Sequence, residues 1–579
     1  MRLSLLSIAC FAASSSQALS IPSPHSLSAR QVPSNIDSSI FLRRGYHASA
    51  VLNGTVYIDG GEFSYTAGGS NVYQVSSTLI AISLADDWTN ETVSLESISK
   101  PSGVPNLSGG GIWVDSENSV LYTGFAGRVS SFGERTSQPN GLWRFSPTSG
   151  SWANLNSTAD AFTNNYIRPY NGLVASGNGK GYALGGFING FNTSGLLTYN
   201  FTSNELTNTT VTSAATDGGI VQMGRMIFVP NFGPSGILVS VGGDQYEKVK
   251  AATDDFIPMD TVQIFDPASG HWYDQPTTGD TPPKRKEYCL AGVASDNSTY
   301  EIFLYAGWDG KLGGGELQYD SVYVLTLPGF HWVQADYPEH HPRHGLTCES
   351  IGGGQMLTIG GIDTTQIDKA NLYEGPFETS DPFTKGLGIF DISTLSWKTS
   401  YSSSQTVYTP SSDILDFYKT NGRLSALNST SLKSLFSTTN FTGVPTSTSG
   451  SPASSTPSSS SSSSSSPSPS PSPSSSSDTN STHTGAIAGG VVGGVAGVAL
   501  IAAVIFYFLR RRKQQQNSSE SASVGRPGYG EFYKVPGREP HGYESPRELA
   551  NTGLVEASAG SVVPSVELPA YKTRVHELG

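Results

Sequence analysis

The chain has 579 residues, a net charge of −13 and only 14% charged residues. This length exceeds one ordinary domain. The acidic balance, with no basic stripe away from one short cluster, excludes a nucleic-acid-binding protein. The 65 glycines and the 10% aromatic content favour an all-β protein rich in turns. Three cysteines are too few for a disulfide scaffold.

Residues 1–18 are typical of a secretory signal peptide. Arg2 supplies the positive start, residues 3–13 form the apolar stretch, and Ser16-Gln17-Ala18 fits the small-x-small cleavage pattern. The apolar stretch is too short to span a bilayer, although an uncleaved anchor remains the alternative. Residues 19–43 form an N-terminal segment ahead of a repetitive region.

Residues 44–400 carry two linked marks that recur along the chain. The first mark is a Gly-Gly pair after a short apolar run, formed by Gly60, Gly61, Gly185, Gly186, Gly242, Gly243, Gly360 and Gly361. Two weaker copies, at Gly124 and Gly307, bring the number of copies to six. The second mark is a tryptophan that follows an apolar residue and a turn: Trp88, Trp152, Trp272, Trp332 and Trp397.

These marks resemble kelch repeats, each of which makes one four-stranded blade of a β-propeller. The resemblance implies an all-β fold with six blades, because residues 398–445 contain no seventh glycine pair. Gly-Gly suits inner strands that approach closely, and a tryptophan on an outer strand can cover the gap to the next blade. A flat β-sandwich with chance glycines is the alternative. The chain before Arg43 is expected to lend a strand to closure of the ring.

Three segments follow the predicted propeller, after a connector at residues 401–445. Residues 446–484 are rich in Ser and Pro, which predicts an O-glycosylated stalk without a core. Residues 485–509 are uncharged and apolar, and Arg510-Arg511-Arg512-Lys513 follows at once, which predicts a membrane-spanning helix with its basic end in the cytoplasm. Residues 510–579 then form a disordered cytoplasmic tail. A GPI signal is the rival interpretation of the apolar run.

Glycosylation sequons support an extracellular head. Eleven asparagines begin Asn-x-Ser/Thr on the predicted outer side: Asn53, Asn90, Asn106, Asn156, Asn192, Asn200, Asn208, Asn297, Asn428, Asn440 and Asn480. Sequons also arise by chance in Ser/Thr-rich chains. Within the predicted span, Gly489, Gly493 and Gly497 repeat every fourth residue, which favours a helix-mediated homodimer, although small residues are frequent in such helices.

One branch of the kelch superfamily, the galactose-oxidase type, binds copper through Tyr and His, so the chain was compared with that pattern. His340, His341 and His344 cluster with Tyr288 and Tyr337 as conceivable partners. The pair His340-His341 fits a solvated loop better, and neither the family's Tyr-His pair nor a spare cysteine for its cross-link is present. We therefore expect no catalytic residues, no metal and no cofactor.

Cys289 and Cys348 occupy nearly matching places in the first strands of the fifth and sixth repeats. Neighbouring inner strands can bring them within disulfide range in an oxidising compartment, whereas two separate buried thiols are the alternative. Four aspartates lie next to glycine marks and either line a ligand surface or stabilise turns: Asp59, Asp244, Asp309 and Asp363.

The favoured function is a non-enzymatic binding, adhesion or wall-sensing protein of the fungal cell surface. The run Gly485–Gly494 resembles the membrane segments of fungal cell-wall sensors and fungal kelch membrane proteins, and the Ser-rich stalk agrees. The resemblance implies a single-pass type I protein of the plasma membrane with an extracellular head. Its expected partner is a cell-wall glycan or a surface glycoprotein. The alternative is a membrane-tethered extracellular carbohydrate oxidase of galactose-oxidase type.

Overall fold

The computed structural model describes residues 37–132, 141–155, 168–188, 191–216, 218–245, 255–311, 317–338, 341–365, 367, 371–404, 407–441 and 566–567. All of these belong to one compact unit. The predicted signal peptide, stalk and spanning helix lie outside the described residues, as does the tail except for residues 566–567. No helix among the described residues is both long and apolar enough to cross a membrane.

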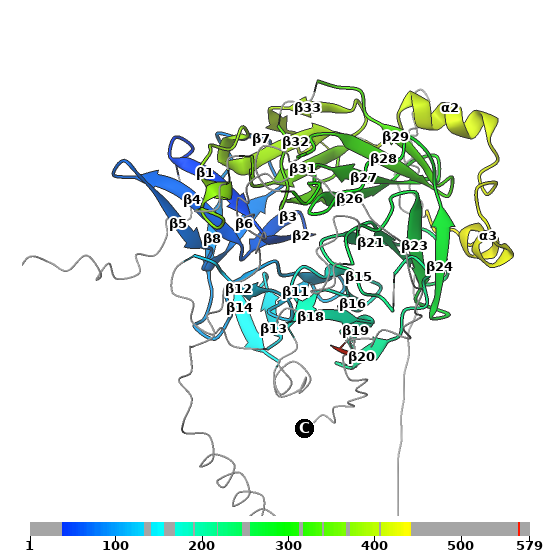
Figure 1. The fold of residues 1–579 in the computed structure, drawn as a ribbon, viewed down its shortest axis with the longest axis horizontal. Helices are drawn as coiled ribbons and strands as arrows, with labels where there is room; N and C mark the ends of the chain where they lie inside the picture. Colours follow the sequence, from blue (N-terminus) through cyan, green and yellow to red (C-terminus); the bar gives the residue numbers. More distant parts are fainter. Residues whose placement is uncertain are drawn as a thin grey trace, which may run out of the picture. The chain divides into compact units, whose positions relative to one another are not determined.

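Six sheets in the described residues each contain four antiparallel strands that follow one another along the chain (Figure 1). The fifth sheet has one further strand, β25 (Thr278–Gly279), which pairs in parallel with its fourth strand. The first three sheets are β2 (Ala48–Leu52), β3 (Thr55–Asp59), β6 (Thr78–Ser83) and β8 (Glu96–Ser99); β10 (Trp113–Asp115), β11 (Val120–Thr123), β13 (Trp143–Ser146) and β14 (Ser151–Asn154); and β15 (Leu173–Gly177), β16 (Lys180–Leu184), β19 (Leu196–Asn200) and β20 (Leu206–Thr209).

The remaining three sheets repeat this meander order. They are β21 (Arg225–Val229), β22 (Ile237–Val241), β23 (Thr261–Asp266) and β24 (His271–Pro276); β26 (Cys289–Ala294), β27 (Tyr300–Tyr305), β28 (Val322–Leu327) and β29 (His331–Gln334); and β30 (Thr347–Ser350), β31 (Gln355–Ile359), β32 (Leu387–Asp391) and β33 (Ser396–Lys398). The first strands contact one another in the cyclic order β2, β10, β15, β21, β26, β30 and back to β2. Small antiparallel sheets arranged in this way fit a kelch-like β-propeller.

The glycine marks end the second strand of a sheet and fasten it to the next sheet. The Gly61 N–H donates to the Leu107 carbonyl at 2.8 Å, and the Gly361 N–H donates to the Arg44 carbonyl at 2.7 Å. Gly60 has φ +64°, and a Cβ built on it would overlap the Leu107 carbonyl. The repeat therefore requires glycine because a backbone group of the neighbouring sheet occupies the side-chain position.

The tryptophan marks lie on the fourth strands, directly opposite an apolar residue of the third strand. The facing pairs are Phe145–Trp152, Phe265–Trp272, Leu325–Trp332 and Phe390–Trp397. Trp272 packs into a cluster with Tyr182 of the preceding sheet, and so covers the gap between two sheets. Trp88 differs, because it lies in a separate strand, β7 (Trp88–Thr89), which pairs with β34 (Ser400–Tyr401).

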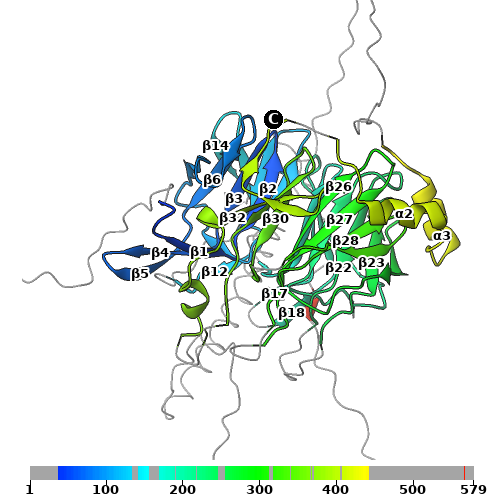
Figure 2. The same ribbon diagram turned by 90° about the horizontal axis from the view of Figure 1, so that it is seen from above.

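Short elements are inserted between the second and third strands. The hairpin of β4 (Glu62–Ala67) and β5 (Ser70–Val75) projects away from the first sheet (Figures 1 and 2) and pairs with β1 (Phe41–Gly45). The described part of the chain before Arg43 thus joins this insertion, rather than closing the ring as expected. The other elements inserted in this way are β12 (Arg128–Val129), β17 (Phe187–Ile188), β18 (Phe191–Ser194), η1 (Gly375–Phe377) and η2 (Thr384–Gly386), whereas β9 (Leu107–Ser108) lies between the first and second sheets.

Two helices occupy the segment predicted as a connector. They are α2 (Ser412–Thr420) and α3 (Thr430–Ser437), which lie beside the fourth and fifth sheets (Figure 2). Phe436 of α3 packs against Phe232 and Phe330, and Tyr418 of α2 accepts a hydrogen bond from the Gly329 N–H at 2.9 Å. The segment is therefore attached to the sheets. At the far end of the chain, β35 (Val566–Glu567) pairs in parallel with β18.

Candidate functional site

Six residues, one ahead of each innermost strand, form a closed backbone ring that we call the axial ring. The members are Tyr46, Gly109, Asn171, Met223, Glu287 and Gly345, and each has a φ between +55° and +67°. The N–H of each member donates to the carbonyl of the preceding member, and the Tyr46 N–H donates to the Gly345 carbonyl, at 2.7 to 3.0 Å. Four of these residues are not glycine, so the strained φ is imposed by the closed set of hydrogen bonds.

A cavity of about 170 Å³ is lined by the axial ring and by the beginnings of the six innermost strands. Three charged side chains reach it: Arg225, Glu287 and Glu349. The Arg225 guanidinium donates to the Gly224 carbonyl at 3.2 Å and to the Leu346 carbonyl at 3.1 Å, so it links the fourth sheet to the sixth. Burial lowers the pKa of Arg225, but two fixed acceptors hold the cation in place.

Glu287 lies at one end of a buried polar chain. Its carboxylate lies 2.6 Å from His344 Nδ1, and His344 Nε2 lies 3.1 Å from the Thr364 hydroxyl. The His344 ring also stacks on Trp308 at 4.8 Å between centroids. Burial acts to raise the pKa of Glu287, but the hydrogen bond and charge of His344, helped by neighbouring cations, lower it below its ordinary value. Glu287 is therefore an anion held between adjacent sheets.

The other wall of the cavity carries polar pairs between the first and sixth sheets. His47 Nε2 lies 2.8 Å from the Thr347 hydroxyl, and the Ser49 hydroxyl donates to Glu349 at 2.6 Å. Burial lowers the pKa of His47 well below its ordinary value, and burial raises the pKa of Glu349 to about 7. His47 is therefore neutral near neutral pH, and Glu349 passes between its protonated and charged forms there, in contrast to Glu287.

Loops after the glycine marks surround the end of the ring where the axial ring lies. We call residues 37–45, 60–77, 306–311, 317–321, 360–365 and 371–386, which belong to the first, fifth and sixth sheets, the loop face. The exposed large hydrophobic side chains of the described residues all fall here: Leu317 is 56% exposed, Tyr373 44% and Ile40 36%. Because these three sheets are neighbours around the ring, the side chains share one sector of the molecule.

Asp363 joins the parts of the loop face to one another. Its carboxylate accepts from Gln318 at 2.9 Å and from the Thr379 hydroxyl at 3.2 Å, and lies 3.6 Å from the Arg43 guanidinium. Burial acts to raise the pKa of Asp363, but its hydrogen bonds and Arg43 lower it. The carboxylate therefore stays charged and connects segments of the fifth, sixth and first sheets.

Each of the other aspartates beside a glycine mark also has a cationic partner. Asp59 pairs with Lys100, Asp244 lies 2.7 Å from the Lys286 ammonium, and Asp309 lies 2.9 Å from that of Lys311. The first two carboxylates are buried. These contacts favour the structural reading, in which the aspartates hold the loops in place.

The residues compared with the copper pattern make separate structural contacts. His344 engages Glu287 and Thr364, and the hydroxyls of Tyr288 and Tyr337 donate to the carbonyls of Val241 and Asp320. His340 lies outside the described residues. Within the part of the chain that the structure describes, no group of three His, Cys, Asp or Glu side chains is arranged to hold a metal.

Cys289 and Cys348 are joined in the structure, with Cα atoms 5.4 Å apart. Cys289 begins β26 and Cys348 lies in β30, so the bond connects the innermost strands of the fifth and sixth sheets. Both residues are buried and both line the axial cavity.

The predicted glycosylation sites divide by exposure. Asn53, Asn297, Asn428 and Asn440 are exposed, whereas Asn90, Asn106, Asn200 and Asn208 are half-buried. The Asn90 amide already donates to the Leu387 carbonyl at 2.5 Å. Asn156, Asn480 and the side chain of Asn192 lie outside what the structure describes.

Comparison with known proteins supports the kelch-like fold. A kelch repeat-containing protein of Arthroderma benhamiae is 26% identical over 405 residues, an alignment that covers 62% of this chain and 57% of that protein. The alignment therefore spans little more than half of the relative. Residues 487–517 match the family model of the epidermal growth factor receptor transmembrane-juxtamembrane segment, which overlaps the predicted membrane span.

Sequence reasoning missed the axial ring and the exposed residues of the loop face. A positive φ at Tyr46, Met223 or Glu287 has no signature in residue type. Aligning the residues that precede each inner strand could have revealed the six equivalent positions, but not their conformation.

Proposed function

We propose that this chain is a non-enzymatic binding protein of the cell surface, whose six sheets are the blades of a propeller. The loop face is the contact surface for a cell-wall glycan or a surface glycoprotein. A single membrane span at residues 485–509 anchors the head above a Ser/Pro-rich stalk. The single observation that carries this proposal is the exposure of Ile40, Leu317 and Tyr373 on loops of the sixth sheet and its two neighbours.

The chemistry of the loop face suits recognition. Exposed apolar and aromatic side chains are enriched at surfaces that bind a partner, because contact of apolar groups with water is unfavourable. The network around Asp363 holds the neighbouring segments in one arrangement before a partner arrives, which reduces the entropy lost on binding. The buried titratable groups of the axial cavity are engaged with one another, which suits a scaffold better than a reaction centre.

Binding by the full chain, solubilised in detergent, is measured on an array of cell-wall polysaccharides and surface glycoproteins. A double variant, Leu317→Ser with Tyr373→Ser, should weaken binding at least about ten-fold. Lys433→Ser, an exposed change on α3, is the matched control and should bind as the parent does. Equal binding by the double variant and the control would place the contact surface elsewhere.

Metal analysis of the same preparation separates this proposal from the carbohydrate oxidase. Stoichiometric copper together with oxidation of a sugar would overturn the binding proposal. Retention of binding after treatment with a strong chelator would support it.

The proposed topology is tested separately. A chain that crosses the membrane once at residues 485–509 places residues 566–567 on the side away from the sheets, which is incompatible with the pairing of β35 and β18. An epitope fused after Gly579 should be reachable by antibody only in permeabilised cells. Staining of intact cells would favour the β18–β35 pairing and overturn the single span.

A further inference from the structure

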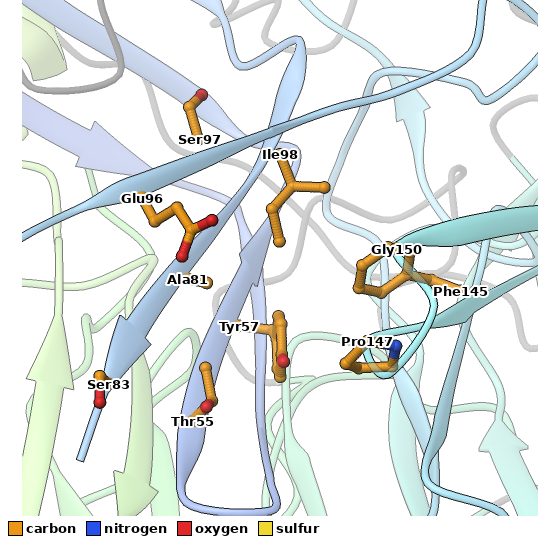
Figure 3. Close-up of a pocket in the computed structure, with 10 residues that line it drawn as sticks. All are labelled: Thr55, Tyr57, Ala81, Ser83, Glu96, Ser97, Ile98, Phe145, Pro147 and Gly150. Atoms are coloured by element: carbon orange, nitrogen blue, oxygen red, sulfur yellow. The ribbon is translucent and has the colours of Figure 1, made fainter. Parts of the chain in front are cut away.

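A pocket of about 380 Å³ lies between the first and second sheets, at the end of the strands opposite the loop face (Figure 3). Residues of β3, β6 and β8 form one wall, and β13 with the turn between β13 and β14 forms the other. Its volume is within the range of pockets that hold small molecules. The pocket shares no residue with the loop face or the axial cavity.

The lining combines apolar surfaces with polar groups. The rings of Tyr57 and Phe145 are buried and meet edge to face, with centroids 6.2 Å apart. Half-buried Ile98 and Pro147 provide the accessible apolar surface, and Pro147 lies across the pocket from Tyr57 (Figure 3). Glu96 is exposed and its carboxylate points into the same space (Figure 3), and Ser83 lies near it. A pyranose ring has apolar C–H faces and a rim of hydroxyls, so it complements this mixture of surfaces.

One of the predicted glycosylation sites lies beside this pocket. Leu52 pairs with Thr55, so Asn53 and Gly54 form a two-residue hairpin turn, with φ values of +50° and +69°. Asn53 is exposed, and Asn53-Gly54-Thr55 is a sequon. Thr55 itself lines the pocket, and two residues of backbone span no more than about 7 Å.

We propose that Asn53 carries an N-linked glycan whose first sugars pack into the pocket between the first and second sheets. The inference rests on the proposed extracellular location of the head. In the modification, Asn53 Nδ2 forms a bond to C1 of the first sugar as the bond from C1 to the diphosphate of a glycosyl donor breaks. Nδ2 loses one proton, and the diphosphate departs with the bonding electrons.

Attachment beside the pocket favours occupation by this glycan over occupation by a free sugar. A tethered group is present at an effective concentration of about millimolar, so weak contacts suffice to hold it. The packed sugar covers Ile98 of the first sheet and Pro147 of the second, and its hydroxyls form hydrogen bonds with the Glu96 carboxylate and the Ser83 hydroxyl. The glycan thus links the first and second sheets at the strand ends opposite the loop face.

The test uses the full chain made in a glycosylating fungal host and compares two sites by mass spectrometry. Asn297, in the hairpin between β26 and β27, is the matched control, because it is exposed at the equivalent turn of the fifth sheet. In the native protein, an endoglycosidase should release the glycan from Asn53 at least about ten-fold more slowly than from Asn297. After denaturation the two rates should be equal.

Variants of the pocket show whether it causes the protection. Glu96→Gln with Ser83→Ala should bring the release rate at Asn53 toward that at Asn297, without loss of fold, because both residues are exposed. Glu117→Gln, an exposed change in the second sheet outside the pocket, is the control and should behave as the parent. Asn53→Gln should lower the Tm by about 2 °C or more, as should removal of that glycan from the parent.

Each outcome separates this inference from the proposed function. Glycans at other sites with none at Asn53 overturn the inference and leave the extracellular head in place. Absence of glycan at every site overturns both. A glycan at Asn53 that is released as fast as that at Asn297 is present but not packed, and this result also overturns the inference. Unchanged protection in the Glu96→Gln, Ser83→Ala variant rejects this pocket as its location.

Discussion

Burial of Glu301 should make the stability of the head fall as the pH rises from 4.5 to about 8, whereas buried His47, whose pKa is lowered, acts in the opposite direction below its ordinary value of 6.5. Glu301 lies in β27 with its side chain fully buried. Its Oε1 accepts hydrogen bonds from the hydroxyls of Thr299 at 2.5 Å and Thr326 at 3.0 Å, while its buried Oε2 has no hydrogen-bond partner among the described residues. Burial raises the pKa of Glu301 from 4.5 to about 8, although the two hydroxyls act in the opposite direction.

The direction of the effect follows from proton binding. Between pH 4.5 and about 8, folded Glu301 keeps its proton while the unfolded chain releases it, so the free energy of unfolding decreases as the pH rises. The loss begins near pH 4.5 and is complete above about pH 8. A shift of this size corresponds to a change on the order of 5 kcal/mol. Glu349, whose pKa is raised to about 7, adds a smaller change of the same sign.

Urea unfolding followed by tryptophan fluorescence, repeated across this pH range, measures the slope. Glu301→Gln keeps the shape and an acceptor for both hydroxyls but cannot ionise, so it should remove the larger part of the pH dependence. Glu117→Gln, at an exposed position, should leave the slope unchanged. If Glu301→Gln retains the parent's slope within about 0.5 kcal/mol, the buried carboxyl is not its source.

Three further outcomes are expected. Trp272→Ala should destabilise the head by about 3 to 5 kcal/mol in urea unfolding, because the ring is only 8% exposed between two sheets; a change under about 0.5 kcal/mol would contradict its burial. Gly345→Ala should lower the free energy of unfolding by about 1 to 2 kcal/mol, because φ is +67°. Steric overlap adds little, since the nearest atom to a new Cβ is 3.4 Å away, and an unchanged free energy of unfolding would mean that the backbone is not strained there. The denatured, non-reduced protein should show no alkylatable thiol at Cys289 or Cys348, and the bond, closing a separation of 59 residues, should contribute about 4 kcal/mol; two free thiols would disprove it.

The repeats could be recognised in the sequence because the four-stranded sheets make the same local contacts. A carbonyl of the next sheet occupies the side-chain position at Gly60, so glycine recurs wherever that contact recurs. Phe265 and Trp272 face each other across a hairpin, so their spacing follows from the turn between them. Such constraints act over a few residues and leave a periodic trace in residue type.

Contacts between distant segments were decided only by the tertiary structure. The positive φ of Met223 and Glu287 comes from a ring of hydrogen bonds that exists only when all six sheets are assembled. Leu317 and Tyr373 share a sector because their sheets are neighbours, and each residue by itself has an unremarkable sequence context.

The segment before the first sheet also depends on the tertiary structure. The sequence before Arg43 has no feature that distinguishes a ring-closing strand from β1, because either strand is short and partly apolar. The choice depends on which open edge is within reach, and the inserted hairpin β4–β5 supplies one. Local sequence therefore determined the repeating unit of this protein, whereas the joining of its units, the axial ring and the loop face depended on the assembled fold, since those interactions link residues far apart in the chain.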